Sequence, residues 1–334
     1  MMKVAVIGVG HLGKIHARIY HQIPNVELVA VVDVDATRVA EVAKEYETVG
    51  YTDYKELFGK VDAVSIATIT PLHYKIATEF LEHNIHVLVE KPLTETAEQS
   101  AKLVQLAKEH NCTLQVGHVE RFNPIVETMM AKNVEPLFIQ AERCSPFRFR
   151  SGDVSVVMDI MIHDIDIVRA LAKSEVVKIE AIGTNLLGVQ EDLVQAKLTF
   201  ASGCIAVLTA SRVALNQSRC IKVFAKQHYI DINYATGEGK CYHVPPKEEL
   251  IAWNLQKGVP EQFKGMTFEE MFYGKILPEE PFEVIKHEPL YAELDSFISC
   301  IIDKKTPRVT GEDGYEAVKI ANEIIKSVKE ANKL

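Results

Sequence analysis

The chain has 334 residues, 47% of them hydrophobic, which is enough for two globular domains with full cores. The formal net charge of −9, without a run of Lys and Arg or an apolar stretch of membrane-spanning length, argues against nucleic acid and membranes as partners. Six scattered cysteines form no C-x-x-C pair and do not combine with histidines at zinc-ligand spacing, so we expect reduced thiols, no metal and a cytoplasmic protein.

The first predicted element is a buried strand, Val4–Ile7, that runs directly into the sequence G-x-G-x-x-G. Glycine is needed there because the turn is tight and a pyrophosphate must lie against bare backbone. The helix that follows, Gly13–Gln22, then offers free N–H groups and the positive end of its dipole to the phosphates. The predicted cofactor contacts in this turn are Gly8, Gly10, His11, Leu12 and Gly13.

A second predicted strand, Leu28–Asp33, ends in an acid twenty residues after the last glycine of the turn. An acid at this position hydrogen-bonds the ribose hydroxyls of NAD and repels the extra phosphate of NADP, so we expect Asp33 to select NAD. Arg38 could offset this charge, but it lies a full turn into the next helix, Thr37–Lys44. The alternative is an ordinary strand–turn–helix without a ligand, which the complete pattern disfavours.

Strands and helices continue to alternate to about residue 117, which predicts a doubly wound parallel sheet in an NAD-binding Rossmann domain over residues 1–121. Ligands bind at the carboxyl ends of strands in such sheets, so the turns after the third and fourth strands should line the cofactor crevice. The remaining elements expected here are a short helix at Asp53–Leu57, strands at Ala63–Ala67, His86–Val89 and Thr113–Val116, and helices at His73–Glu82 and Ala97–His110.

Two turns at that edge carry the candidate polar residues. The first turn, Ala67–His73, would contact the cofactor. It also suits a helix start, with Thr70 as N-cap and Pro71 at the first helical position, and the two roles are compatible. In the second, desolvation and the nicotinamide cation would lower the pKa of Lys91, making it a proton acceptor or electrostatic clamp; an exposed, idle lysine is the alternative. The predicted cofactor contacts of the two turns are Thr68, Thr70, Pro71, His73, Glu90, Lys91 and Pro92.

Beyond residue 121 the pattern changes to longer runs that alternate apolar with polar residues. We expect residues 122–334 to form a second α/β domain with a largely antiparallel sheet that is covered on one face. Its expected elements are helices at Pro124–Lys132 and Val156–Ala172, strand-like runs at Leu137–Arg143, Val176–Leu187, Leu193–Phe200, Cys204–Arg212 and Cys220–Asn233, a loop-rich segment at Thr236–Glu280, and helices at Glu288–Ile302 and Gly314–Ala331.

The helix near residue 160 carries Asp159, His163 and Asp166. Positions i and i+4 share a helix face, so Asp159 can orient His163. A histidine oriented by a carboxylate is the usual general base near neutral pH. A core-packed histidine in an acid-rich helix is the alternative.

The motifs G-x-G-x-x-G, T-P-x-x-H, E-K-P and D-x-x-x-H-x-x-D, in this order and at these separations, resemble the Gfo/Idh/MocA oxidoreductases over essentially the whole chain. The resemblance implies an NAD-dependent dehydrogenase with a Rossmann domain followed by an α/β domain. The open sheet of that second domain often joins subunits, so we expect a homo-oligomer, a dimer or a tetramer. The resemblance also implies that Lys91 and His163 are the catalytic pair, meeting across the cleft between the domains, that Asp159 lies near the substrate, and that Pro92 is cis.

One position departs from the family pattern, because most members have glycine where this chain has Met161. Met161 and the segment Gly117–Pro124 resemble the nucleotide-sugar branch, which includes UDP-N-acetylglucosamine 3-dehydrogenases that form a 3-keto sugar. Four arginines, Arg121, Arg143, Arg148 and Arg150, would suit the oxygens of a diphosphate-bearing substrate. They could equally form a solvated basic face. The predicted substrate contacts are Arg121, Asn123, Arg148, Arg150, Asp159 and His163, with Arg143 as a further candidate.

Two alternatives to a nucleotide-sugar dehydrogenase remain open, one for the small-molecule substrate and one for the activity. An inositol or free-sugar dehydrogenase of the same family would not need the arginine cluster. A cofactor-sensing regulatory protein on the same scaffold should have lost Lys91 or His163, and both residues are present.

Overall fold

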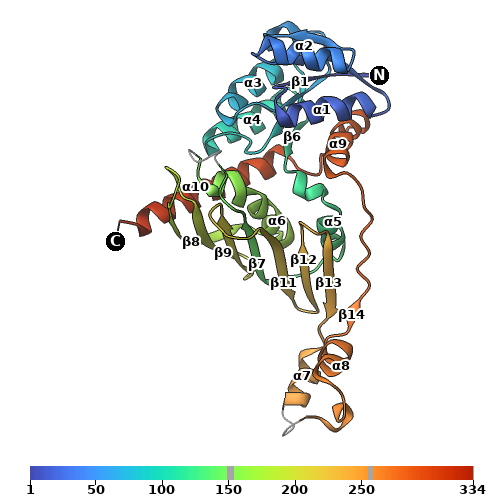
Figure 1. Ribbon diagram of the computed structural model, residues 1–334, viewed down its shortest axis with the longest axis vertical. Coiled ribbons are helices and arrows are strands. Elements are labelled where there is room, and N and C mark those ends of the chain that lie inside the picture. The colour runs from blue at the N-terminus through green and yellow to red at the C-terminus, as the bar shows by residue number, and fades with distance from the viewer. Residues whose placement is uncertain (149–153, 255–258, 334) are drawn as a thin grey trace. The chain divides into compact units, whose positions relative to one another are not determined.

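The computed structural model describes residues 1–148, 154–254 and 259–333 (Figure 1). Over this range the chain folds into two compact units, and each contains its own β-sheet. The first consists of residues 1–122 and 287–323, and the second comprises the described residues of 123–286 and 324–334. Residues 287–323 therefore return to the first unit. The two compact units thus differ from the predicted domains, which were the continuous stretches 1–121 and 122–334.

The first unit has a six-stranded parallel sheet in the order β3-β2-β1-β4-β5-β6. This is the doubly wound Rossmann arrangement predicted from the alternating strands and helices, with its switch point between β1 and β4. The elements are β1 (Met2–Ile7), α1 (His11–Gln22), β2 (Val26–Val32), α2 (Ala36–Glu45), β3 (Val49–Tyr51), a 3-10 turn (Tyr54–Leu57), β4 (Ala63–Ile66), α3 (Thr70–Glu82), β5 (His86–Glu90), α4 (Ala97–Glu109), β6 (Leu114–Gly117) and a 3-10 turn (Val119–Phe122).

One late helix, α9 (Pro289–Asp303), completes the core of this unit. Its buried face (Leu294, Phe297 and Ile298) belongs to the same apolar cluster as Ala17 and Tyr20 of α1. The side chain of Gln115 in β6 also donates a hydrogen bond to a backbone carbonyl of α9. The Rossmann sheet therefore needs a helix from the end of the chain to cover part of its apolar surface.

The start of α3 differs from the expectation. Thr70 is the first residue of the helix, and Ile69 occupies the N-cap position without any side-chain capping bond. The backbone becomes helical one residue earlier than predicted, which leaves Pro71 in the first turn, where its missing N–H costs nothing. The N-cap assignment of Thr70 was therefore wrong.

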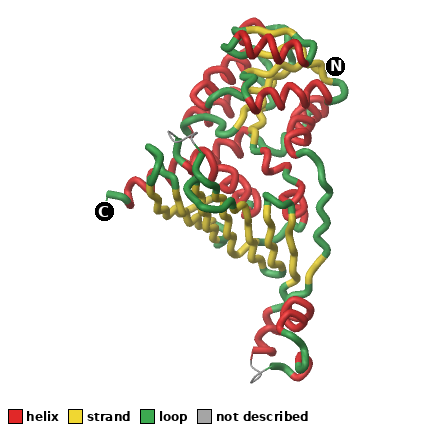
Figure 2. The backbone as a smooth tube through the Cα atoms, in the orientation of Figure 1, coloured by secondary structure: helices red, strands yellow, loops and turns green. Residues whose placement is uncertain are grey.

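The second unit has an eight-stranded mixed sheet in the order β14-β13-β12-β11-β7-β10-β9-β8. Only β7 and β10 pair in parallel, and the other neighbours are antiparallel, as predicted in the main. Figure 2 shows a broad row of strands with helices along one side. The strands are β7 (Pro136–Cys144), β8 (Val176–Thr184), β9 (Leu193–Phe200), β10 (Ile205–Ser211), β11 (Ser218–Ala225), β12 (His228–Asn233), β13 (Glu238–His243) and β14 (Glu279–Glu280).

Three details of this unit correct the sequence-based expectations. The run Cys220–Asn233 is two strands, β11 and β12, because the chain reverses at residues 226–227 without a glycine or proline to signal the turn. The segment expected to be loop-rich contains β13 and several short helices. The helix expected from residue 156 begins as a π-helical turn before α6. The unit's helical elements are α5 (Pro124–Ala131), the π-turn Val157–Met161, α6 (Ile162–Ala172), α7 (Lys247–Asn254), a 3-10 turn (Glu261–Phe263), α8 (Phe268–Met271) and a π-turn (Phe272–Ile276), while α10 (Gly311–Ala331) spans both units.

Among the helices that the structure describes, none is both long enough and apolar enough to cross a membrane.

A buried carboxylate organises the loop between β8 and β9. One oxygen of Asp192 accepts hydrogen bonds from the backbone N–H groups of Leu186, Leu187 and Gly188 at 2.6–2.8 Å. Its other oxygen lies 3.5 Å from Nε of the buried Arg212. Burial by itself raises the pKa of Asp192, but these donors more than compensate, and the pKa lies below its ordinary value.

We therefore expect Asp192→Asn to destabilise the second unit by about 1–3 kcal/mol at pH 7, where the ionised carboxylate makes its full contribution. A carboxyl group with a lowered folded pKa contributes stability above its unfolded pKa of about 3.9 and loses it as the pH falls further, so the difference should shrink by pH 3. Urea unfolding at the two pH values measures this effect. Glu180→Gln, at an exposed carboxylate of β8, is the control; an equal loss at both pH values would contradict the assignment.

Candidate active site

A pocket of about 510 Å³ lies at the carboxyl ends of β1, β2 and β4, beside the switch point of the first sheet. It therefore occupies the edge where the sequence predicted the cofactor crevice. Another hollow, of about 680 Å³, lies at the amino ends of β5 and β6 and contains none of the predicted site residues. The 510 Å³ pocket is lined by Ile7, Gly8, Gly10, Val32, Asp33, Val34, Arg38, Thr52, Tyr54, Ala67, Thr68, Ile69, Leu72, Lys75 and Ile76.

The three glycines of the first turn differ in the space around them: Gly8 and Gly13 are closely packed, and Gly10 is open. A Cβ on Gly8, whose φ is +83°, would lie 2.7 Å from the carbonyl oxygen of Ala67, and a Cβ on Gly13 would lie 1.7 Å from that of Gly8. A Cβ on Gly10 would meet nothing within 4 Å. Gly10 also precedes α1 as an N-cap without a side-chain capping bond. The turn thus presents bare backbone at a helix N-terminus, which is the cradle that a pyrophosphate requires.

Asp33 is held beside this turn by backbone donors. Its Oδ2 accepts a hydrogen bond from the N–H of Val9 at 2.9 Å, and its Oδ1 accepts one from the N–H of Asp35 at 3.0 Å. Arg38 reaches back from α2, with Nη1 at 3.1 and 3.2 Å from the two carboxylate oxygens of Asp33. Its position one turn into the helix therefore does not keep its charge away from Asp33, because the long side chain folds back along the helix.

His73 joins the two polar turns at the strand ends. The ring is fully buried, with Nδ1 2.9 Å from the carbonyl oxygen of Pro92 and Nε2 3.1 Å from that of Thr68. Burial lowers the pKa of His73, which favours the neutral ring, and a neutral imidazole donates to only one of the two carbonyls. His73 thus fixes the backbone of both turns and is absent from the lining of the pocket.

Lys91 comes directly after β5, and the Lys91–Pro92 peptide bond is cis, as the resemblance implied. The side chain of Lys91 is half-buried. Its N–H donates to Oε2 of the preceding Glu90 at 3.3 Å. The backbone of the predicted catalytic lysine is therefore held by its own neighbour in the sequence.

Glu90 belongs to a buried polar chain beneath this turn. Its Oε1 lies 3.1 Å from Nε2 of His16, and Nδ1 of His16 lies 2.7 Å from the hydroxyl of Ser65. A Cβ at Gly117 would come within 2.8 Å of the Glu90 carboxylate, so glycine makes the space for it. His16 and Ser65 could not be found from the sequence, since both lie inside regular elements with no motif around them.

In the second unit, His163 lies in the first turn of α6 and Asp159 lies in the preceding π-turn, and both are half-buried. The neighbouring Asp164 is buried and forms a two-pronged pair with Arg143 of β7, with N–O distances of 2.9–3.2 Å. Arg143 is itself 4% exposed. Arg143 therefore anchors the helix to the sheet, and its contact with a substrate phosphate stays a prediction.

The other predicted substrate residues have varied surroundings. Nη2 of Arg121 donates to the carbonyl of Arg308 at 3.2 Å, so at least part of its guanidinium is used within the first unit. Asn123 is the N-cap of α5 and accepts a hydrogen bond from the N–H of Ile125. Arg148 is exposed, and Arg150 lies outside the described residues.

Comparison with known proteins agrees with this geometry. Residues 2–118 match the family described as "Oxidoreductase family, NAD-binding Rossmann fold", and residues 138–230 match the "GFO/IDH/MocA C-terminal domain". The UDP-N-acetylglucosamine 3-dehydrogenase of Acidithiobacillus ferrooxidans is 30% identical over 98% of this chain and 97% of its own length. Its solved structure superimposes with a TM-score of 0.85 over 98% of each chain.

A second relative, the scyllo-inositol 2-dehydrogenase (NAD(+)) of Bacillus subtilis, is 28% identical over 93% of this chain and 90% of its own length. The family of dehydrogenases and the NAD-binding fold expected from the motifs are thus confirmed, and the open cradle at Gly10 fits the cofactor. The chain belongs to the Gfo/Idh/MocA family of NAD-dependent oxidoreductases.

Proposed function

We propose that this enzyme oxidises a hydroxyl group of a nucleotide sugar, at C3 of a UDP-N-acetylamino sugar, to the 3-keto sugar. The observation that carries the substrate assignment is the likeness to a UDP-N-acetylglucosamine 3-dehydrogenase over nearly the full length of both chains. The inositol dehydrogenases among the relatives support the competing assignment, a free polyol or sugar.

The first unit offers places for the pyrophosphate and a ribose of NAD, which when bound supplies the hydride acceptor. Gly10 and the N-terminus of α1 would hold the pyrophosphate, and Asp33 would accept hydrogen bonds from the ribose hydroxyls. The turn at Thr68 would line the same pocket. His73 and Glu90 would act by fixing the backbone around these contacts.

We assign the removal of the hydroxyl proton to Lys91 and His163, with Asp159 beside the substrate. Lys91 is supported by its position at the carboxyl edge of the sheet, directly after β5. His163 is supported by its half-buried position in α6, one residue before the salt bridge that fixes the helix to β7. Both residue types exchange protons when burial and charge adjust their pKa.

We further propose that residues 1–121 bind the cofactor, and that residues 122–334 carry the substrate contacts and join subunits in a homo-oligomer. An aromatic row crosses four strands of the second sheet: Phe138, Phe224, Tyr229 and Tyr242, with ring centroids 4.9–6.0 Å apart. Along the strands these rings alternate with buried residues such as Ile230 and Cys241, so they lie on the opposite face of the sheet. Tyr242 at one end of the row is buried, but Phe224 is 40% exposed, and an exposed aromatic surface of this kind suits contact with a second copy.

Asp33→Ala should narrow the preference for NAD over NADP by about tenfold, because the charge opposing the 2′-phosphate disappears and Arg38 is released beside the same position. Arg38→Ala should widen the preference, since Asp33 then acts alone. The ratio of kcat/KM for the two cofactors measures both effects. Glu41→Ala, on the exposed face of α2, is the control, and equal kcat/KM with both cofactors in the unaltered protein would rule out selection by Asp33.

Lys91→Ala and His163→Ala should each lower kcat by about 10²–10⁴-fold while the protein still folds and binds NAD, because each removes a proton-transfer group. Steady-state kinetics, with circular dichroism and an NAD titration, separates chemistry from folding. The exposed Lys102→Ala and His83→Ala are matched controls. Unchanged kcat in either active-site variant removes that residue from the mechanism.

A panel of UDP-sugars, free sugars and inositols decides the substrate, with NADH formation as the readout. We expect UDP-N-acetylamino sugars to give the highest kcat/KM. Arg148→Ala should then raise KM for them by about tenfold with kcat nearly unchanged, because a diphosphate contact acts on ground and transition states alike. Arg18→Ala, at a half-buried arginine of α1 that pairs with Glu288, is the control.

Equal kcat/KM for free monosaccharides or inositols would replace the nucleotide-sugar assignment with the free-sugar alternative. NAD binding without turnover of any compound in the panel would favour a cofactor-sensing protein.

A further inference from the structure

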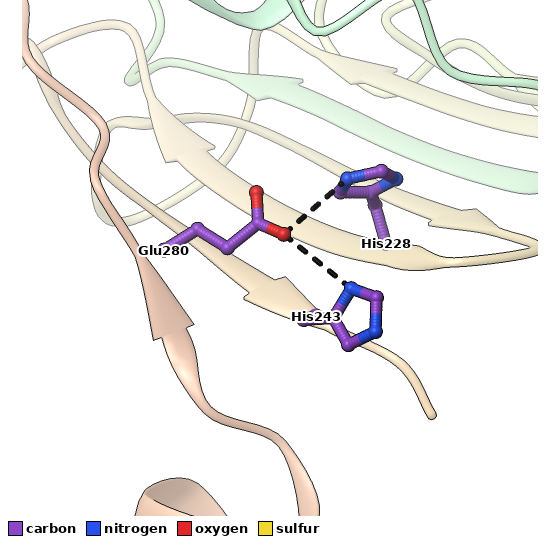
Figure 3. A group of neighbouring side chains, drawn as sticks. All are labelled: His228, His243 and Glu280. Carbon is purple, nitrogen blue, oxygen red and sulfur yellow. Dashed lines mark ion pairs between the residues drawn. The ribbon is translucent and has the colours of Figure 1, made fainter. Parts of the chain in front are cut away.

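Two histidines and a glutamate converge on one point at the edge of the second sheet (Figure 3). His228 of β12 is directly opposite His243 of β13, and Glu280 of β14 is directly opposite Cys241. Side chains two residues apart on a strand share a face, so this register places all four side chains on the same face of the sheet. The hydrogen-bonded strands, rather than a loop, bring these residues together.

The spacing of the three side chains matches a metal coordination sphere. Oε1 of Glu280 lies 3.5 Å from Nε2 of His228 and 3.5 Å from Nδ1 of His243. One ligand atom from each residue lies within 4.8 Å of the others. Good hydrogen bonds are shorter, at about 2.7–3.2 Å. A tetrahedral zinc ion with ligands at about 2.0–2.1 Å holds its ligand atoms about 3.4 Å apart, close to the separations from Glu280.

The second oxygen of Glu280 is already anchored. Oε2 accepts a hydrogen bond from Nζ of Lys132 at 2.8 Å and lies 3.7 Å from Sγ of Cys241. The Lys132 ammonium thus engages Oε2, whereas both histidine nitrogens face Oε1. Anchoring one oxygen also fixes the direction of the other, which is how outer contacts orient metal ligands.

We propose that His228, His243 and Glu280 bind a divalent transition-metal ion of the zinc type, with water in the fourth position. Two imidazoles and one carboxylate suit zinc, whereas calcium and magnesium prefer oxygen ligands. The ion would cross-link β12, β13 and β14 at the point where residues 244–278 leave and rejoin the sheet. Its role would be structural and independent of the dehydrogenase reaction.

The sequence predicted no metal because its cysteines and histidines do not combine at zinc-ligand spacing. The group of His228, His243 and Glu280 contains no cysteine ligand and has no such spacing in the sequence. The three residues come from separate strands, and only the pairing of β13 with both neighbours brings them together.

Titration of chelator-treated, full-length protein with zinc chloride in a calorimeter tests the proposal. We expect one equivalent to bind the unaltered protein, and binding at least tenfold weaker in His228→Gln, His243→Gln and Glu280→Gln. Glu279→Gln is the matched control, because this neighbouring carboxylate contacts Lys240 and lies on the other side of the two-residue strand. His21→Gln, at an exposed histidine of α1, controls for the loss of one imidazole.

A measurement on the unaltered protein avoids any folding defect in the variants. In zinc-soaked crystals, an anomalous-scattering peak among the three side chains would support the site. A peak only elsewhere, no zinc binding, or undiminished binding in the three variants would overturn it.

Discussion

The close approach of the first turn to the turn after β4 is the constraint on which the cofactor site depends. Gly8 and Gly13 leave no room for a Cβ because Ala67 and the turn's own backbone fill the space. This packing brings the N-terminus of α1 to the carboxyl edge of the sheet and leaves Gly10 open. The strand order places both turns at the switch point between β1 and β4. The pocket therefore forms beyond the carboxyl ends of these strands.

Behind this pocket, buried polar residues fix the turns without lining it. His73 connects the carbonyls of Thr68 and Pro92, while Glu90 contacts His16 and the backbone of Lys91. An unpaired buried polar group costs about 1–3 kcal/mol, so each of these contacts favours one backbone arrangement over others. The backbone of the proposed catalytic lysine is thus held by a carboxylate that is itself in contact with a buried histidine.

The second unit uses its charges in a similar way. Asp164 and Asp192 are fully enclosed and paired with Arg143 and Arg212, which couple α6 and the β8–β9 loop to the sheet. Asp159 and His163, in the same helical segment as Asp164, remain half-buried. Acids that look alike along one helical segment therefore differ in burial: Asp164 is enclosed, and Asp159 is half-buried. The His228, His243 and Glu280 group adds a further polar contact among three strands of this sheet.

The sequence by itself determined the Rossmann unit and its cofactor edge, because glycine turns, buried strands and Asp33 follow local rules of backbone space and periodicity. Motif order also determined the family. Only the tertiary structure decided which charged groups are engaged: Arg38 folds back onto Asp33, Arg143 is paired with Asp164, and His73 is buried. The return of α9 to the first unit and the meeting of His228, His243 and Glu280 likewise depend on contacts between distant segments. Such contacts leave no periodic signal in the chain, since they form only when separate strands and helices pack together.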